Sequence, residues 1–298
     1  MEEEVIQKYK KAGEIAKKAI EYSKEIIKEN MTYLEFTEKV EKKIKELGGD
    51  FAFPVNISAN SIAAHYTAKL NDDKIFKKGD LVKIDIGVHI DGYIADTAYT
   101  IEVGNNNWND LIKASEEALK AAIDVIKPGI EISKVGAAIE DTIKAKGFVP
   151  IANLSGHELE EWELHAGMNI PNFDNKSSAK IEDGMAIAVE PFATNGIGHV
   201  IDAEKSEIYQ LINARPVRLP VARKILEWAA EKRKALPFCK RWVVNEVKGF
   251  GVDMAIRQLV LNESFHNFPV LKEEKEGMVS QTEHTILLSG GEKIVTTG

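Results

Sequence analysis

Five potential metal ligands stand at long and uneven spacings in this 298-residue sequence: Asp85, Asp96, His157, Glu190 and Glu283. Four are carboxylates and one is an imidazole. Carboxylate oxygens can bridge two adjacent divalent cations, and one histidine adds a nitrogen ligand of intermediate softness. If these side chains converge, they predict a two-metal site that activates water and performs hydrolysis.

The first two carboxylates lie in a predicted β-hairpin. Residues 81–90 are rich in Val and Ile, and Asp91-Gly92 is a strong signal for a two-residue turn before a second strand. Such a turn places Gly87 opposite Asp96, with Asp85 on the same face as a diagonal neighbour of Asp96. Two carboxylates on one face are costly without a cation between them, and we expect Gly87 to leave room for it. The alternative is a solvated pair on an exposed face.

The remaining carboxylates are set in apolar sequence. Glu190 follows a predicted strand over 186–189, and Glu283 lies within another over 279–288. A lone buried carboxylate is strongly disfavoured, so both residues indicate nearby cations, unless each is a protonated or salt-bridged core glutamate. His157 follows Ser155-Gly156, and a histidine in such a loop is by itself more often structural than a ligand.

The pattern of elements repeats with an offset of about 100 residues. Apolar periodicity predicts helices over 1–28 and 109–126. Each is followed by a second helix that begins at a hydroxyl side chain, Thr32 or Ser133, and ends at a glycine. We interpret the repeat as two related α+β halves that place ligands on facing strands.

Residues 200–275 break this repeat and are predicted to be mostly helical. Helices are predicted over 220–235, 238–248 and 253–262. We therefore expect a catalytic domain formed by residues 1–199 and 276–298, with residues 200–275 as a helical insert. The insert is rich in basic residues, which are Arg215, Arg218, Arg223, Lys224, Lys232, Arg233, Lys234, Lys240 and Arg241. A solvated helix face is the ordinary explanation, and ribosome contact is the alternative.

Composition narrows the class of protein. The chain has 39 basic and 47 acidic residues, a net charge of −8, which gives no overall attraction to nucleic acid or to anionic membranes. Its single cysteine, Cys239, cannot form an intrachain disulfide, and no run of about 18 apolar residues occurs. We expect a soluble, cytoplasmic, monomeric protein that binds neither membrane nor specific nucleic acid.

The sequence resembles the type 2 methionine aminopeptidases of the M24 metallopeptidases, in the archaeal-like form, over essentially its whole length. The resemblance is carried by ordered segments: Ala63-Ala64-His65-Tyr66-Thr67, Lys83-Ile84-Asp85-Ile86-Gly87-Val88-His89-Ile90-Asp91-Gly92, Ala95-Asp96-Thr97-Ala98, Ser155-Gly156-His157, Leu164-His165-Ala166-Gly167, Val189-Glu190-Pro191-Phe192 and Glu283-His284-Thr285-Ile286-Leu287-Leu288. It implies the α+β pita-bread fold with an internal pseudo-twofold repeat and a winged-helix-like insert.

The resemblance also implies roles for individual residues. All five candidate ligands would hold two divalent metal ions (Co, Mn, Fe, Zn or Ni), and an activated hydroxide would attack the first peptide bond. Glu190 would also move the proton from the nucleophile to the leaving nitrogen. His65 and His165 would bind the scissile amide or carbonyl, and Phe53 and Phe268 would line the methionine pocket.

The expected function is therefore removal of the initiator methionine from nascent polypeptides during protein maturation. One alternative is an X-Pro peptidase of the same fold, although such enzymes carry a sizeable N-terminal domain before the core pattern. The other is a non-catalytic pita-bread protein that binds a partner. Such relatives lose metal ligands, whereas all five candidates are present here.

Overall fold

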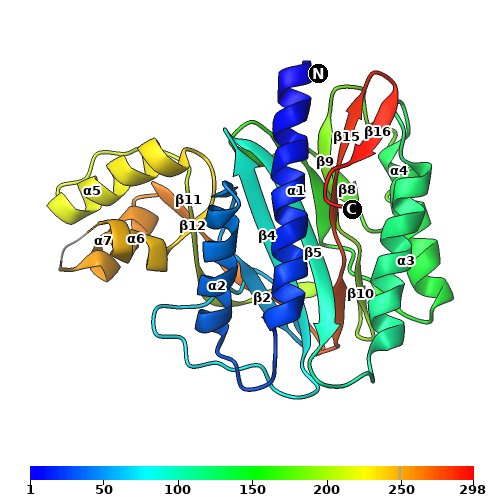
Figure 1. Ribbon diagram of the computed structural model, residues 1–298, viewed down its shortest axis with the longest axis horizontal. Coiled ribbons are helices and arrows are strands. Elements are labelled where there is room, and N and C mark those ends of the chain that lie inside the picture. Colours follow the sequence, from blue (N-terminus) through cyan, green and yellow to red (C-terminus); the bar gives the residue numbers. More distant parts are fainter. Residues whose placement is uncertain (248–249) are drawn as a thin grey trace.

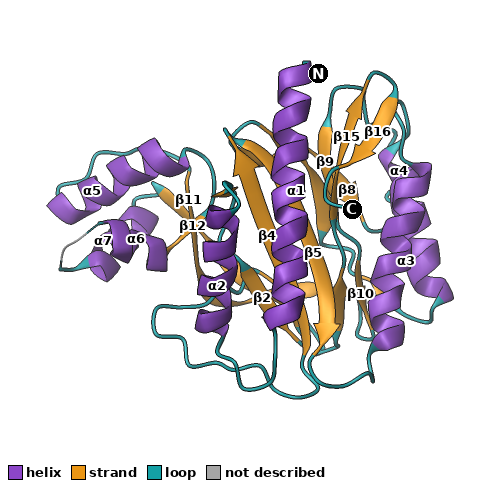
Figure 2. Ribbon diagram, in the orientation of Figure 1, coloured by secondary structure: helices purple, strands orange, loops and turns teal. Residues whose placement is uncertain are grey.

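The computed structural model describes residues 1–247 and 250–298. Figure 1 shows two helix-covered sheet regions side by side, with a third, smaller unit on the left that contains α5 (Pro220–Trp228), α6 (Lys240–Glu246) and α7 (Val252–Leu261). Figure 2 shows that helices and strands are mixed throughout, with α1 (Glu3–Ile26) and α2 (Tyr33–Glu46) lying over one face of the sheet that contains β4 (Leu81–Ile90) and β5 (Tyr93–Glu102). Among the described residues, no helix is both long enough and apolar enough to cross a membrane.

A pair of helices followed by antiparallel strands occurs twice along the chain. The first helix pair packs on a sheet with the path β1-β4-β2, and β5 joins β4 at its free edge. The bounds in this half are α1 (Glu3–Ile26), α2 (Tyr33–Glu46), β1 (Asp50–Phe51), β2 (Asn56–Ala59), β3 (Ile62–Ala64), β4 (Leu81–Ile90) and β5 (Tyr93–Glu102). Apolar side chains of both helices and of β4 form one continuous core.

The second helix pair packs on the rest of the sheet structure in the same way. A five-stranded sheet runs in the order β16-β15-β9-β7-β8, and a short sheet runs β14-β10-β6. The bounds are α3 (Asn109–Val125), α4 (Ile132–Ala145), β6 (Val149–Pro150), β7 (Ser155–Glu160), β8 (Glu163–Pro171), β9 (Ala186–Val189), β10 (Phe192–Thr194), β14 (Val279–Gln281), β15 (His284–Ser289) and β16 (Glu292–Val295). The repeated order of helices and strands fits the two-half α+β interpretation.

The predicted hairpin register is confirmed. β4 and β5 pair without a bulge, and Gly87 lies opposite Asp96. The cap at Thr32 is also confirmed, because its side chain accepts a hydrogen bond from the Glu35 N–H. The cap predicted at Ser133 is wrong: the helix begins one residue earlier, with Glu131 as the N-cap, and Ser133 is buried in its first turn.

Two predictions of secondary structure need correction. The strand predicted over 279–288 is interrupted, and Glu283 lies between β14 and β15, where it forms an isolated bridge with Ala98 of β5. The segment 200–275 is not mostly helical. Long antiparallel strands form both of its ends, and β13 continues the pairing onto β3 of the first half. Pairing with a neighbouring strand allows a segment of largely polar sequence to form a β-strand and to bury the apolar residues that it has.

Helices occupy only the middle of this segment. Its elements are β11 (Val200–Leu211), α5 (Pro220–Trp228), the π-helical turn η1 (Ala229–Arg233), β12 (Phe238–Cys239), α6 (Lys240–Glu246), α7 (Val252–Leu261) and β13 (Phe265–Glu273). The helix predicted over 238–248 is therefore shorter, and residue 248 lies outside the described part of the chain. Apolar residues of α5, α6, α7 and β13 form a separate small core.

Candidate active site

The five residues singled out by the sequence line one pocket. Asp85 comes from β4, Asp96 from β5 and His157 from β7. Glu190 follows β9 directly, and Glu283 occupies the break between β14 and β15. Residues almost 200 positions apart in sequence therefore share one site, and Asp96, His157 and Glu283 each offer an atom within 4.8 Å of the others.

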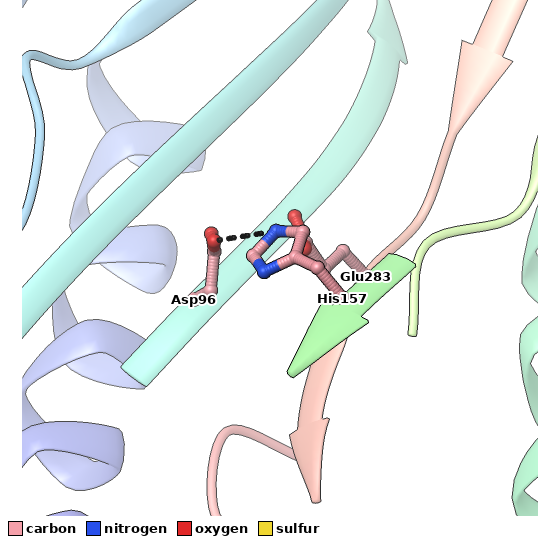
Figure 3. Close-up of side chains that lie close together, drawn as sticks. All are labelled: Asp96, His157 and Glu283. Carbon is pink, nitrogen blue, oxygen red and sulfur yellow. Dashed lines mark ion pairs between the residues drawn. The ribbon is translucent and has the colours of Figure 1, made fainter. Parts of the chain in front are cut away.

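The side chains of this cluster point toward one another. Figure 3 shows the Asp96 carboxylate directed at the His157 ring, with Glu283 beside them. His157 Nε2 lies 3.7 Å from Asp96 Oδ2 and 3.7 Å from Glu190 Oε1. That separation is too long for a hydrogen bond, but it suits atoms that each lie about 2 Å from a shared metal ion.

Several of these buried atoms have no protein partner among the described residues. They are Asp85 Oδ1, Asp96 Oδ1, His157 Nδ1 and both carboxylate oxygens of Glu283. A buried carboxylate without hydrogen bonds is strongly disfavoured unless a cation neutralises it. The donor set of carboxylates and one imidazole therefore fits divalent metal ions, and the alternative of a solvated Asp pair does not fit, since Asp96 is 3% exposed.

The pKa shifts of these residues also favour bound divalent cations. Burial raises the pKa of Asp85 to about 7. Burial, together with repulsion from neighbouring carboxylates, raises the pKa values of Asp96, Glu190 and Glu283 well above their usual range. Burial lowers the pKa of His157 to about 4, so its imidazole is neutral at pH 7 and can act as a ligand. Cations would relieve this repulsion and favour all four charged carboxylates.

One residue of this site, Gln281, was missed in the sequence. It is 1% exposed, and its Nε2 donates to Glu190 Oε2 at 3.2 Å. The Gln281 amide also favours the charged form of Asp85 and so opposes the effect of burial, which raises the pKa of that carboxyl. Gln281 lies two residues before Glu283, so the period of a strand could have placed both on one face. Its amide orients Glu190, one of the candidate ligands.

Threonine hydroxyls hold the segment 281–285 against β5. Thr285 Oγ1 accepts from the Asp96 N–H at 2.7 Å and donates to the Asp96 carbonyl at 2.8 Å. Thr100 Oγ1 makes the equivalent pair of bonds with the Gln281 backbone. Thr97 Oγ1 donates to the Glu283 carbonyl. We call these three residues the threonine seam, because they join the two halves at the backbone of the candidate ligands.

His65 and His165 lie in the same pocket. His65 has a left-handed φ of 67°, and its Nδ1 lies 3.1 Å from the Pro269 carbonyl. The ring of His165 contacts that of His157 edge to face, with centroids 4.5 Å apart, and it lines the pocket. Burial lowers the pKa of His65 to about 4, and it also lowers that of His165, so both are neutral at pH 7.

Phe53 and Phe268 both line this pocket, beside further apolar residues that were not predicted from the sequence: Leu164, Ile208 and Pro237. Three of the five, Ile208, Pro237 and Phe268, come from the segment 200–275, so this segment forms one wall of the pocket. One expectation is wrong. The space over Gly87 does not hold a cation, because the Phe53 ring packs directly on it.

The chain is similar to known proteins over its whole length. The model of metallopeptidase family M24 matches residues 7–219. The chain is 44% identical to a methionine aminopeptidase of Methanocaldococcus jannaschii and 46% identical to one of Archaeoglobus fulgidus, each over 297 residues that cover 100% of both chains.

Solved structures share the fold at low sequence identity. A thermophilic Arx1 superposes with a TM-score of 0.88 at 18% identity, covering 100% of this chain and 91% of that one. A methionine aminopeptidase of Thermotoga maritima superposes with a TM-score of 0.72 at 23% identity, covering 100% and 98%. A prolidase of Pyrococcus furiosus has a TM-score of 0.61 at 22% identity, with only 64% of its own chain covered.

Proposed function

The chain belongs to the M24 metallopeptidase family, and we propose from this premise that it is a methionine aminopeptidase. It removes the initiator methionine from nascent proteins and peptides. The observation that carries the proposal is the convergence of Asp85, Asp96, His157, Glu190 and Glu283 on one pocket in a chain whose relatives at 44% and 46% identity carry that name over their full length.

We propose that these five residues hold two divalent metal ions, of which Co, Mn, Fe, Zn and Ni are the candidates. The unpartnered carboxylate oxygens and the neutral His157 support this assignment. Metal ions bound there would lower the pKa of a water molecule and polarise the scissile carbonyl. Gln281 supports the site by holding one oxygen of Glu190, which leaves Glu190 Oε1 facing His157. That oxygen is the atom we assign to proton transfer toward the leaving nitrogen.

The tautomer of His65 suggests which substrate atom it contacts. A carbonyl oxygen can only accept, so the contact with Pro269 requires the proton on Nδ1. A neutral His65 then presents Nε2 as an acceptor. We propose that His65 accepts from the N–H of the scissile amide. His165, on β8 of the β7–β8 hairpin, is our candidate for contact with the scissile carbonyl and with the charge that develops on it.

The side-chain pocket is built for an apolar first residue. Phe53, Leu164, Ile208, Pro237 and Phe268 supply its surface. Apolar walls with few polar groups bind an unbranched thioether side chain such as methionine. We propose that its substrates are cytoplasmic nascent chains that begin with Met, that the enzyme acts as a monomer, and that any ribosome contact is transient.

The test is initial rates on Met-Ala-Ser, Leu-Ala-Ser and an Ala-Pro tripeptide, using metal-stripped protein with and without Mn²⁺ or Co²⁺. We expect metal-dependent release of Met from the first peptide. Asp96→Asn should lower kcat/KM by about 100-fold or more through loss of metal. Asp91→Asn is the matched control, because Asp91 is the exposed turn residue of the same hairpin.

The outcomes separate the alternatives. Cleavage of only the Ala-Pro peptide would assign the chain to the X-Pro peptidases. No cleavage of any peptide by folded, metal-loaded protein would favour a non-catalytic binding protein. Equal activity in Asp96→Asn and Asp91→Asn would remove the five-residue cluster from the mechanism.

A further inference from the structure

Arg233 occupies an unusual position for an arginine. It is the last residue of η1 and is 5% exposed. Its Nη2 lies within hydrogen-bond distance of the Phe51 carbonyl (2.7 Å), the Ala52 carbonyl (3.1 Å) and the Pro237 carbonyl (2.8 Å). One side chain therefore joins two backbone segments that are nearly 200 residues apart in sequence.

Each of these segments forms part of the pocket wall. Phe53 follows Ala52 directly, and its ring packs on Gly87 between the pocket and β4. The Ala52 N–H donates to the Gly87 carbonyl at 3.0 Å, so this stretch is also tied to the strand that carries Asp85. Pro237 lines the pocket on the side of the insert. The distance between the two walls is fixed through one guanidinium group.

The free-energy cost of burying the Arg233 side chain favours a positioning role inside the protein over an interaction with solvent or a partner at the surface. A buried cation is costly to desolvate, and it persists only where charge-assisted hydrogen bonds compensate. Arg233 takes this compensation from main-chain carbonyls, which cannot rearrange as side chains can. All three carbonyls lie around one amino group of the guanidinium, Nη2, whose N–H bonds are held in the plane of the group, whereas the N–H bonds of an ammonium rotate freely.

The local backbone is irregular at the same point. The helix α5 changes to a π-helical turn that ends at Arg233, and Lys234 follows with φ 53° and ψ −115°. A non-glycine residue rarely adopts such angles, and strain of this kind persists only where the surroundings enforce it. Lys234 Nζ then lies 3.7 Å from the centre of the Trp162 ring, on the hairpin that carries His157 and His165. The irregular backbone therefore directs two consecutive basic side chains toward the catalytic domain, Arg233 to the first half and Lys234 to the second half.

We propose that Arg233 is a specificity-determining positioning residue, which sets the width of the pocket for the first side chain of the substrate by holding the Phe53 wall and the Pro237 wall together. This inference rests on the proposed aminopeptidase function. It also gives a basic residue of the segment 200–275 an intramolecular role instead of a solvated or ribosome-facing one.

The experiment compares full-length, metal-loaded variants on Met-Ala-Ser and Leu-Ala-Ser. Arg233→Met keeps the volume and removes the donors, and Arg233→Lys keeps the charge but not the planar fork. We expect Arg233→Met to raise KM for the Met peptide about tenfold, to change kcat less than about twofold, and to lower the Met/Leu ratio of kcat/KM about tenfold. Arg233→Lys should recover part of the selectivity.

The matched control is the double variant Arg241→Met with Glu41→Gln. Arg241 is the other buried arginine of the same segment, and it forms a bidentate pair with Glu41 of α2, away from the pocket. Replacing both partners avoids leaving a buried carboxylate unpaired. This variant should weaken the attachment of the segment 200–275 to the first half. It should keep the Met/Leu ratio of kcat/KM within about twofold of wild type.

A second measurement does not depend on catalysis. Hydrogen exchange of a peptide spanning residues 50–55 should be about tenfold faster in Arg233→Met than in the control, because the Ala52 N–H loses its fixed position. If wild type releases no Met, the function proposal fails, and hydrogen exchange still decides whether Arg233 positions this wall. Unchanged exchange, or a Met/Leu ratio equal to that of the control variant, would overturn the inference.

Discussion

At the scale of single residues, the candidate site is assembled from carboxylates, each of which would be unfavourable if it were buried alone. Asp96, Glu190 and Glu283 repel one another in a buried pocket, and their pKa values are raised by that burial and crowding. The uncharged members of this group are Gln281, which donates to Glu190, and His157, whose imidazole is neutral and can act as a ligand. The metal site that we propose explains why residues that would destabilise an ordinary core lie together here.

Gly87 offers a test of how the apolar pocket is shaped. A Cβ atom at this position would overlap the Phe53 ring. Gly87→Ala should therefore displace the ring, raise KM for Met-Ala-Ser about tenfold, and leave the Mn²⁺ dissociation constant within about threefold of wild type. Steady-state kinetics and titration calorimetry would measure both. An unchanged KM would remove the Phe53 ring from the pocket, and a lost metal site would place the effect on Asp96 instead.

His89 predicts part of the response to acid. It is buried, accepts from the Gly92 N–H at Nδ1 and packs edge to face on Trp162. Burial and the nearby Arg233 lower its pKa to about 4, against about 6.5 in the unfolded chain. The folded state therefore favours the neutral ring, and its contribution to stability is present above pH 6.5 and is lost as the pH falls toward 4.

The variant for this prediction is His89→Gln, which keeps an acceptor for Gly92 but cannot take up a proton. Between pH 6.5 and 4.5 its free energy of unfolding should fall less steeply than that of wild type, by at most about 1.4 kcal/mol per pH unit. Urea unfolding at several pH values measures the slopes. Parallel slopes would show that His89 does not contribute.

At the scale of elements, the threonine seam replaces a regular strand pairing. β5 and the segment 281–285 share only an isolated bridge at Ala98 and Glu283, so side-chain hydroxyls supply the remaining bonds. This arrangement leaves Glu283 free of the strand ladder and directs it into the site. The break in the predicted 279–288 strand is therefore what allows a carboxylate from this segment to reach the other ligands.

Thr285→Val tests the seam. The variant keeps the shape of the side chain but leaves the Asp96 N–H and carbonyl without their partner. We expect a loss of about 1–3 kcal/mol in stability and roughly tenfold weaker Mn²⁺ binding. Thr142→Val is the control, since Thr142 bonds only to the Ala138 carbonyl within α4. Equal metal affinity in the two variants would contradict a role for the seam in ligand placement.

At the scale of the whole molecule, the candidate ligands connect three separated parts of the chain. Asp85 and Asp96 belong to the first half, His157 and Glu190 to the second, and Glu283 to the strands that follow the insert. The insert is joined to the first half through the Arg241 pair with Glu41 and through the β13–β3 pairing. Metal ions at this junction would bind only the folded arrangement.

Metal removal should therefore lower thermal stability. At a metal concentration of 1,000 times Kd, binding stabilises the folded state by about 4 kcal/mol, which corresponds to roughly 8–16 °C in Tm for a chain of this size class. Scanning calorimetry of chelator-treated protein, with and without Mn²⁺, measures the shift. Asp96→Asn should lose it and Asp91→Asn should keep it. A Tm that does not respond to metal in the wild type would count against this junction site.

The sequence alone indicated the candidate metal ligands and determined much of the local structure. The hairpin register followed from a two-residue turn and the alternation of strands, and both led correctly to Asp85 beside Asp96. The acidic candidate ligands were recognisable because carboxylates are rare in apolar strands. Such inferences depend on residues that are close in sequence or on the order of motifs along the chain. Both can be read from a single sequence.

Only the tertiary structure decided what lies between distant segments. The Phe53 ring over Gly87, the amide of Gln281 on Glu190 and the guanidinium of Arg233 on two pocket walls all depend on packing between elements. The same reason explains the errors: Ser133 is buried by its neighbours instead of capping a helix, and β11 and β13 form because each has a partner strand. Local sequence preferences are weak, and long-range pairing overrides them.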